Sequence, residues 1–154
     1  MDENQRRAMK LSSQLCFPLY AAARSIINLY TPYLQEIGIT YTQYLVFLVL
    51  WEKDGIPVGD IGKKLMLDSG TLSPLLKKMQ SAGYIERRRS GDDDRVVVVS
   101  LTAAGRELQE RAKEIPQKVG GCVRLSPEKA RTLYSILYEL LENGGAAENQ
   151  DKTD

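Results

Sequence analysis

The sequence contains no histidine among its 154 residues. Histidine is the base in Ser-His-Asp and Cys-His catalysis, a frequent zinc ligand, and the side chain that changes charge near neutral pH. Its absence excludes all three kinds of chemistry. Any reactive side chain in this protein must therefore be activated without an imidazole.

Cysteine is scarce as well. The sequence holds two, Cys16 and Cys122, which lie far apart along the chain. Two cysteines are too few for a four-ligand zinc site or a disulfide scaffold. We therefore expect an intracellular protein with free thiols that carries no metal ion and no cofactor.

Long apolar segments are missing too. The longest, Tyr44 to Trp51, is far shorter than the roughly 18 residues of a membrane span. The first ten residues are polar and mixed in charge, so we expect no signal peptide, no contact with a membrane and a cytoplasmic location. What is present suits one domain, because 43% of the residues are hydrophobic and the net charge is +1.

Apolar periodicity and capping signals predict a mainly helical chain. Apolar residues recur every three or four positions over 15–37, which is typical of one amphipathic helix. A second helix is expected from Thr40 to about residue 53, a short third from Pro57 to about residue 65, and a fourth over 69–81, capped by Asp68. A fifth, of about 17 residues, follows Thr102 with a kink favoured at Pro116, and a sixth opens at 126–127.

Between the fourth and fifth helices, strand-like runs at 84–89 and 95–101 flank the polar turn 90–94. This pattern predicts a β-hairpin with a charged tip. The fold class is therefore mainly α with a small β-hairpin wing: a winged helix-turn-helix over about 41–101 within a single chain of residues 1–143. Helices in the ranges 10–37 and 102–143 carry apolar stripes that a homodimer would bury, and 144–154 is expected to be a flexible tail.

The segment 61–95 holds eight basic and five acidic residues, an excess of three positive charges. The fourth helix begins with small hydroxyl side chains that can reach base edges or phosphates in a major groove, and arginine at the hairpin suits a narrow minor groove. The alternative is a solvated helix face and a charged edge strand, or an interaction module without DNA. The candidate contacts with double-stranded DNA are Ser69, Thr71, Ser73, Pro74, Lys77, Lys78, Arg87 and Arg95.

The aspartates of the turn would repel phosphate, so we expect Asp92 to Asp94 to cap the turn or to hold Arg95.

Cys16 lies two residues before Pro18, and proline is tolerated only in the first turn of a helix. The first helix should therefore begin near Cys16, where unsatisfied N–H groups and the helix dipole stabilise a thiolate. A thiolate there could attack a peroxide and become a sulfenic acid that a second thiol traps. Otherwise Cys16 is a small buried hydrophobic residue. Cys122 follows two glycines between the last two helices, in a loop from which it reaches a partner sulfur or stays inert.

Four segments of the chain, which together span about residues 11–141, carry a recognisable pattern. They read Gln14-Leu15-Cys16-Phe17 with Leu19-Tyr20; Ile39-Thr40-Tyr41 through Gln43-Tyr44-Leu45 to Leu50-Trp51-Glu52; Leu67-Asp68-Ser69-Gly70-Thr71-Leu72 with Pro74-Leu75-Leu76-Lys77; and Asp94-Arg95 with Val99-Ser100-Leu101-Thr102. These segments resemble the MarR family of winged-helix repressors, and within it the organic-hydroperoxide sensors of the OhrR type. The cysteine segment together with the Tyr41 segment is the more specific to the peroxide-sensing branch.

The resemblance implies a homodimer that binds operator DNA when reduced and releases it when organic hydroperoxide oxidises Cys16. It implies Tyr30 and Tyr41 as hydroxyl partners near that sulfur. It also implies a two-cysteine subtype, in which Cys122 resolves the oxidised Cys16 of the other subunit. Pro18 departs from the pattern, because an ordinary helix former is expected there.

The chain is accordingly expected to be a regulator and not an enzyme. Two other functions stay open. One is a MarR-like repressor released by a non-covalent aromatic ligand, with a structural Cys16. The other is a small thiol peroxidase whose winged helix no longer binds DNA.

Overall fold

The computed structural model describes residues 1–91 and 95–148, except for the side chains of 144–148. The chain divides into two compact units, residues 1–120 and 121–154. The charged tip predicted at Asp92 to Asp94, and the last six residues of the expected tail, lie outside the described residues.

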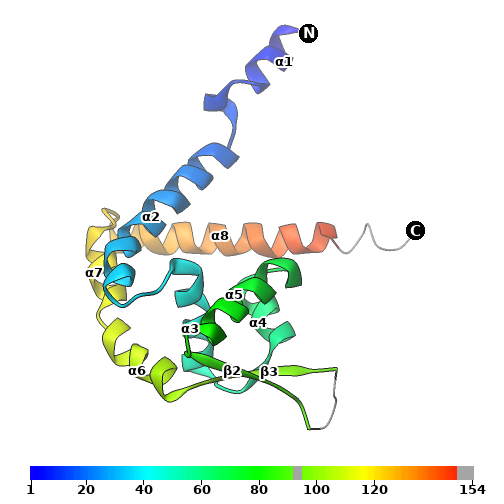
Figure 1. Cartoon of the computed structure of the whole chain (residues 1–154). Helices are drawn as coiled ribbons and strands as arrows, with labels where there is room; N and C mark the ends of the chain where they lie inside the picture. The colour runs from blue at the N-terminus through cyan, green and yellow to red at the C-terminus, as the bar shows by residue number, and fades with distance from the viewer. Residues whose placement is uncertain (92–94, 149–154) are drawn as a thin grey trace. The chain divides into compact units, whose positions relative to one another are not determined.

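Helices make up most of both units (Figure 1). The first unit runs in the order α1 (Glu3–Ala8), η1 (Leu11–Ser13), α2 (Cys16–Glu36), α3 (Tyr41–Glu52), β1 (Ile56–Pro57), α4 (Val58–Leu65), α5 (Ser69–Ser81), β2 (Ile85–Arg89), β3 (Val97–Leu101) and α6 (Ala103–Ala112). The boundary between the units falls inside α7 (Ile115–Cys122), and the second unit continues with α8 (Pro127–Glu148).

The predicted helix starts are confirmed by their caps. Thr40 and Gln43 form a complete capping box at the start of α3, in which each side chain bonds the backbone N–H of the other residue. The carboxylate of Asp68 accepts from the Thr71 N–H at the start of α5. The hydroxyl of Thr102 accepts from the Gly105 N–H at the start of α6.

The expected hairpin is present and gains a third strand that the sequence did not predict. Strands β2 and β3 pair antiparallel from Ile85 opposite Leu101 to Arg89 opposite Val97. The two-residue β1 pairs with the other edge of β3, so the strand order is β1-β3-β2. A strand this short has no period-2 pattern, which is why the sequence predicted no strand here and placed Pro57 at the start of the third helix.

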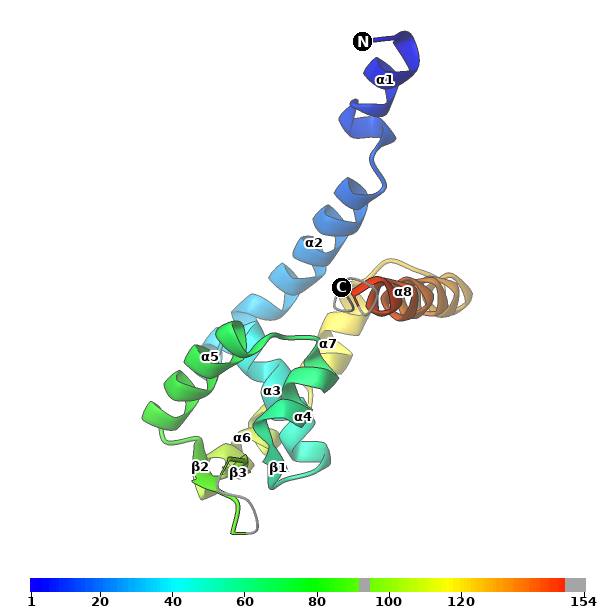
Figure 2. The same ribbon diagram turned by 90° about the vertical axis from the view of Figure 1, so that its right-hand side faces the viewer.

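The core of the first unit forms around α3. Residues 44–51 of this helix are all apolar, which is typical of a largely buried helix, and it buries Tyr44, Val46, Phe47, Val49 and Leu50. Helices α2, α4, α5 and α6 pack against it (Figure 2), and α4, α5 and α6 in turn contact the sheet, so α3 supports the helix-turn-helix directly and the wing through these helices.

The structure corrects three expectations at the C-terminal end. The single helix of about 17 residues expected after Thr102 is two helices, because helical structure is interrupted between Ala112 and Ile115. Pro116 then occupies the first turn of α7. Cys122 is the last residue of α7 and not part of a loop. Helix α8 continues through Glu148, past residue 143 where we expected the ordered chain to end.

None of the helices in 1–91 and 95–148 is long and apolar enough to pass through a bilayer.

Gly105 provides a test of how tightly α6 packs on the sheet. A Cβ built on Gly105 collides with the backbone carbonyl of Tyr84, which cannot move aside as a flexible side chain can. Gly105→Ala should therefore lower the free energy of unfolding by about 2–4 kcal/mol. Gly120→Ala is the matched control, since nothing lies within 4 Å of its built Cβ, and it should be neutral or stabilise by up to about 1 kcal/mol. Equal urea midpoints for the two variants would contradict this packing.

Candidate functional site

Helices α4 and α5 form the helix-turn-helix that the sequence predicts (Figure 2). The turn between them closes at Met66, which adopts the left-handed conformation at φ 52°. Helix α5 buries Leu72, Leu76 and Met79 against the core. The opposite side of α5 faces solvent and carries most of the predicted DNA contacts: Ser69, Thr71, Pro74, Lys77 and Lys78, with Ser73 half-buried.

The first turn of α5 is held rigidly by Asp68. One carboxylate oxygen accepts from the Thr71 N–H at 2.8 Å, and the other accepts from the Thr71 hydroxyl at 2.9 Å. These two bonds lower the pKa of Asp68, so its carboxylate stays ionised at neutral pH. The Thr71 hydroxyl proton is thereby committed to Asp68, and the oxygen lone pairs remain available as acceptors.

The wing is tied to α5 by one of its own arginines. Arg87 Nε donates to Gln80 Oε1 at 2.7 Å, which links β2 to the last turn of α5. Arg87 is half-buried as a result, whereas Arg95 at the wing is exposed. Arg88 forms an ion pair with Glu86 at 2.6 Å. The structure therefore presents Arg95 to solvent and gives Arg87 a positioning contact that the sequence did not predict.

The thiol of Cys16 stands at the first residue of α2 and is exposed. The predicted helix start and the place of Pro18 in the first turn are confirmed. The thiol Sγ donates to Gln14 Oε1 at 3.9 Å. The Gln14 amide in turn donates to the carbonyl of Ala8. Cys16 is thus neither buried nor an apolar core residue.

Tyr30 and Tyr41 lie together, with ring centroids 5.1 Å apart, and Tyr44 packs 5.8 Å from Tyr30. Burial, and then the nearby Tyr30, raises the pKa of Tyr41. Burial, followed by Tyr30 and Tyr41, raises the pKa of Tyr44 to about 12. The hydroxyls of Tyr41 and Tyr44 therefore remain protonated hydrogen-bond donors over the whole physiological range.

These tyrosines are remote from Cys16 within one chain. Tyr30 follows Cys16 on the same helix, and the intervening stretch of α-helix rises about 21 Å. Tyr30 therefore cannot reach the Cys16 sulfur of its own chain, and the expected place of Tyr30 and Tyr41 beside that sulfur stays a prediction. A site that combines them needs Cys16 from one chain and the tyrosines from another.

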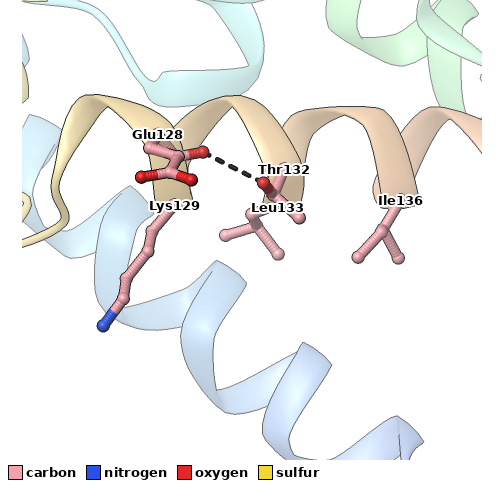
Figure 3. A pocket seen from close by; sticks show the side chains of 5 residues that line it. All are labelled: Glu128, Lys129, Thr132, Leu133 and Ile136. Atoms are coloured by element: carbon pink, nitrogen blue, oxygen red, sulfur yellow. Dashed lines mark hydrogen bonds between the residues drawn. The ribbon is translucent and has the colours of Figure 1, made fainter.

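The second unit carries exposed apolar side chains along α8. A shallow cavity of about 360 Å³ lies on this helix and is lined by Glu128, Lys129, Thr132, Leu133 and Ile136 (Figure 3). Two of these residues are linked within the helix, since the Thr132 hydroxyl donates to the Glu128 carbonyl at 3.1 Å. Leu133 and Ile136 remain 41% and 48% exposed, so this face of α8 is the apolar stripe that the sequence predicts.

Sequence reasoning missed contacts that depend on tertiary structure. Tyr44 could have been found, because it lies one helical turn from Tyr41. The Asp54–Arg106 ion pair of 2.9 Å joins residues far apart in sequence, so no local pattern marks it. The contact of Gln14 with the thiol is local, but no known sequence pattern predicts it. Among the residues that the structure describes, no group of three or more carboxylates or thiols is placed to hold a metal ion.

Comparison with known proteins places this geometry among regulators of transcription. The family model described as transcriptional regulator SarA/Rot matches residues 28–112. The organic hydroperoxide resistance transcriptional regulator of Bacillus subtilis strain 168 is 47% identical over 140 residues, which cover 91% of this chain and 95% of that protein.

Two solved structures of AbfR, a protein of Staphylococcus epidermidis, are also similar. Reduced AbfR bound to DNA aligns with a TM-score of 0.74 and 32% identity, covering 92% of this chain and 99% of that one. Overoxidised AbfR bound to DNA aligns with a TM-score of 0.73 and 33% identity, covering 90% and 98%.

The raised pKa of Tyr44 makes a prediction about alkaline stability. Between pH 10 and about 12 the folded chain keeps the Tyr44 proton that the unfolded chain has lost. The free energy of unfolding should therefore fall as pH rises through this window, by at most about 3 kcal/mol from this group. Urea unfolding followed by circular dichroism from neutral pH upward measures the slope. Tyr44→Phe should flatten it and exposed Tyr20→Phe should not; identical slopes in both variants would contradict the assignment.

Proposed function

The chain belongs to the MarR-like winged-helix family of transcriptional regulators that the SarA/Rot model describes, and from this premise we propose that it is a dimeric repressor whose thiol senses organic hydroperoxides. The observation that carries the proposal is the exposed Cys16 thiol at the start of α2, in the same chain as a helix-turn-helix. The identity of 47% to an organic hydroperoxide resistance regulator supports the same substrate class.

DNA binding is assigned to the exposed side of α5 and to the wing. Two lysines there, Lys77 and Lys78, form no ion pair with any residue in 1–91 or 95–148, so their charges are available to phosphates. The acceptor oxygen of Thr71 suits a base that presents an amino group in the major groove. Arg95 at the wing is exposed and suits the minor groove.

A homodimer is the assembly that makes the sensor site whole. The first turns of α2 expose Phe17, Leu19 and Tyr20, and α8 exposes a second apolar stripe. A second copy would cover both, since a two-fold interface is the commonest way to bury such faces. It would also bring Cys16 to the partner's Tyr30 and the partner's Tyr41.

The chemistry follows from the thiol and its surroundings. The Cys16 thiolate attacks the terminal oxygen of a hydroperoxide; the O–O bond breaks, and the alkoxide leaves as an alcohol after taking a proton, with sulfenic acid left on Cys16. The partner's Cys122 then attacks that sulfur and water is released, which forms a disulfide. The N-terminus of α2 and tyrosine hydroxyl donors supply the stabilisation that an imidazole would otherwise give.

Release from DNA is assigned to the disulfide and not to oxidation of the sulfur alone. Overoxidised AbfR is bound to DNA, so in that relative overoxidation is compatible with binding. A disulfide between Cys16 and the partner's Cys122 has narrow geometric limits. Forming it would move α7, and with it the spacing of the two α5 helices that a pseudo-palindromic operator requires.

We propose a cytoplasmic location for this chain, because a regulator of transcription acts where the DNA is and the Bacillus subtilis relative is named as such a regulator.

Substitution of the sensor thiol tests the function directly. The probe is a fluorescent duplex that the reduced wild-type protein selects from a random-sequence library, followed by anisotropy. Cumene hydroperoxide should release the wild type from the duplex, and Cys16→Ser should bind equally well yet stay bound. Release of Cys16→Ser by the peroxide would contradict the thiol mechanism. Release by an aromatic carboxylate without peroxide would favour a non-covalent ligand, and repeated peroxide turnover by a protein that selects no duplex would favour an enzyme.

The resolving role of Cys122 makes a separate prediction. After cumene hydroperoxide, a non-reducing gel should show a covalent dimer of the wild type that dithiothreitol removes. Cys16→Ser and Cys122→Ser should each abolish that band, because each removes one sulfur of the bond. A band that persists in either variant would refute the Cys16–Cys122 pairing between subunits.

A further inference from the structure

On the edge of β3 that faces β1, the last residue of the strand has no backbone partner in β1. The register pairs Ile56 with Val99 and Pro57 with Val98. Continued by two residues, this register sets Asp54 opposite Leu101, the last residue of β3. The backbone does not continue, because Gly55 turns the chain at φ +69°.

Side chains replace the missing strand at that position. Asp54 Oδ1 accepts from the Leu101 N–H at 2.8 Å, and Arg106 Nη1 donates to the Leu101 carbonyl at 3.0 Å. In an antiparallel ladder one residue of the neighbouring strand would supply both the acceptor and the donor. Here a carboxylate and a guanidinium supply them, and together they satisfy both backbone groups of Leu101.

The side chains of Asp54 and Arg106 also form an ion pair with each other. Arg106 Nη2 lies 2.9 Å from Asp54 Oδ2, and Asp54 Oδ1 also accepts from the Gly55 N–H at 2.8 Å. Their side chains are 56% and 33% exposed, so their mutual attraction contributes little to stability. The directional, charge-assisted bonds to a partly buried strand end are the more important part.

This arrangement joins three elements at the base of the wing. Asp54 follows the end of α3, Leu101 ends β3 opposite Ile85 of β2, and Arg106 lies in the first turns of α6. The strands that carry Arg95 leave from this junction. A change in the hydrogen bonding of Leu101 therefore alters the direction in which both wing strands extend.

We propose that Asp54 and Arg106 are positioning residues for DNA binding: their side chains form the last rung of the wing sheet and so set where the wing presents Arg95. The proposal rests on the proposed function in that the wing must touch DNA. Neither residue needs to contact DNA itself.

The first arm of the test measures the wing without DNA. Hydrogen–deuterium exchange of the reduced full chain should be faster at Leu101 and along β2 and β3 in Asp54→Ala than in the wild type, with α5 unchanged. Asp60→Ala is the matched control, since the structure gives the Asp60 side chain an ion pair with Lys63 at 3.9 Å on the helix surface. If Asp54→Ala does not fold by circular dichroism, Arg106→Met takes its place and leaves the Leu101 carbonyl without its donor. Unchanged wing exchange in the folded variant would overturn the proposal.

The second arm is a double-mutant cycle on the selected duplex. Asp54→Ala should weaken binding about tenfold, which corresponds to about 1.4 kcal/mol. In an Arg95→Ala background the same substitution should cost less than about twofold, because the wing contact is already lost. In a Lys77→Ala background the full loss should persist, since Lys77 belongs to α5.

The outcomes separate this proposal from the proposed function. An equal loss in the Arg95→Ala and Lys77→Ala backgrounds would overturn the positioning role while DNA binding itself stands. If the wild type selects no duplex, the proposed function fails. The hydrogen–deuterium exchange experiment then decides whether Asp54 and Arg106 stabilise the wing strands.

Discussion

The rigid length of α2 is the constraint on which the rest of the structure depends. Its 21 residues extend about 31 Å, with the thiol of Cys16 at one end and Tyr30 near the other. The helix ends in the core, where Leu34 is buried, but begins among exposed apolar side chains such as Phe17 and Tyr20. Because α2 is straight and rigid, it cannot bring its own Tyr30 to its own thiol. Under the proposed function, a second copy would supply the tyrosines to this thiol, so the proposed sensor would be a property of the dimer.

Helix α6 connects α2 to the base of the wing. At its start, Thr102 donates to the Gly83 carbonyl at 2.6 Å, and the Gly105 carbonyl accepts from Trp51 Nε1 at 3.1 Å. Near its end, Arg111 donates to the Glu36 carbonyl at 3.2 Å, at the last residue of α2. The same helix thus contacts the base of the wing and the end of α2. If the proposed disulfide forms, a displacement of α2 has a short, hydrogen-bonded route to the wing through α6.

Local patterns in the sequence predicted the parts of the fold that local physics determines. The capping residues Thr40, Asp68 and Thr102 predicted three helix starts to within one residue of the observed starts. The valine-rich run predicted β3. The sequence predicted a kink at Pro116 where the structure has a break before Ile115, and it did not predict that α8 continues through Glu148. The same division holds for the site. Cys16 and the exposed side of α5 follow from helix position, whereas the separation of Cys16 from Tyr30, and the contact of Arg106 with Leu101, follow from tertiary structure.

Mixed dimers test most directly whether the sensor is completed by the partner. In a dimer of one Cys16→Ser subunit and one Tyr30→Phe/Tyr41→Phe subunit, the single Cys16 faces two intact tyrosines only if the site forms between subunits. The rate of its reaction with cumene hydroperoxide, followed by loss of the free thiol, should then match the wild type, while the Tyr30→Phe/Tyr41→Phe homodimer reacts more slowly. A mixed dimer as slow as that homodimer would contradict the account.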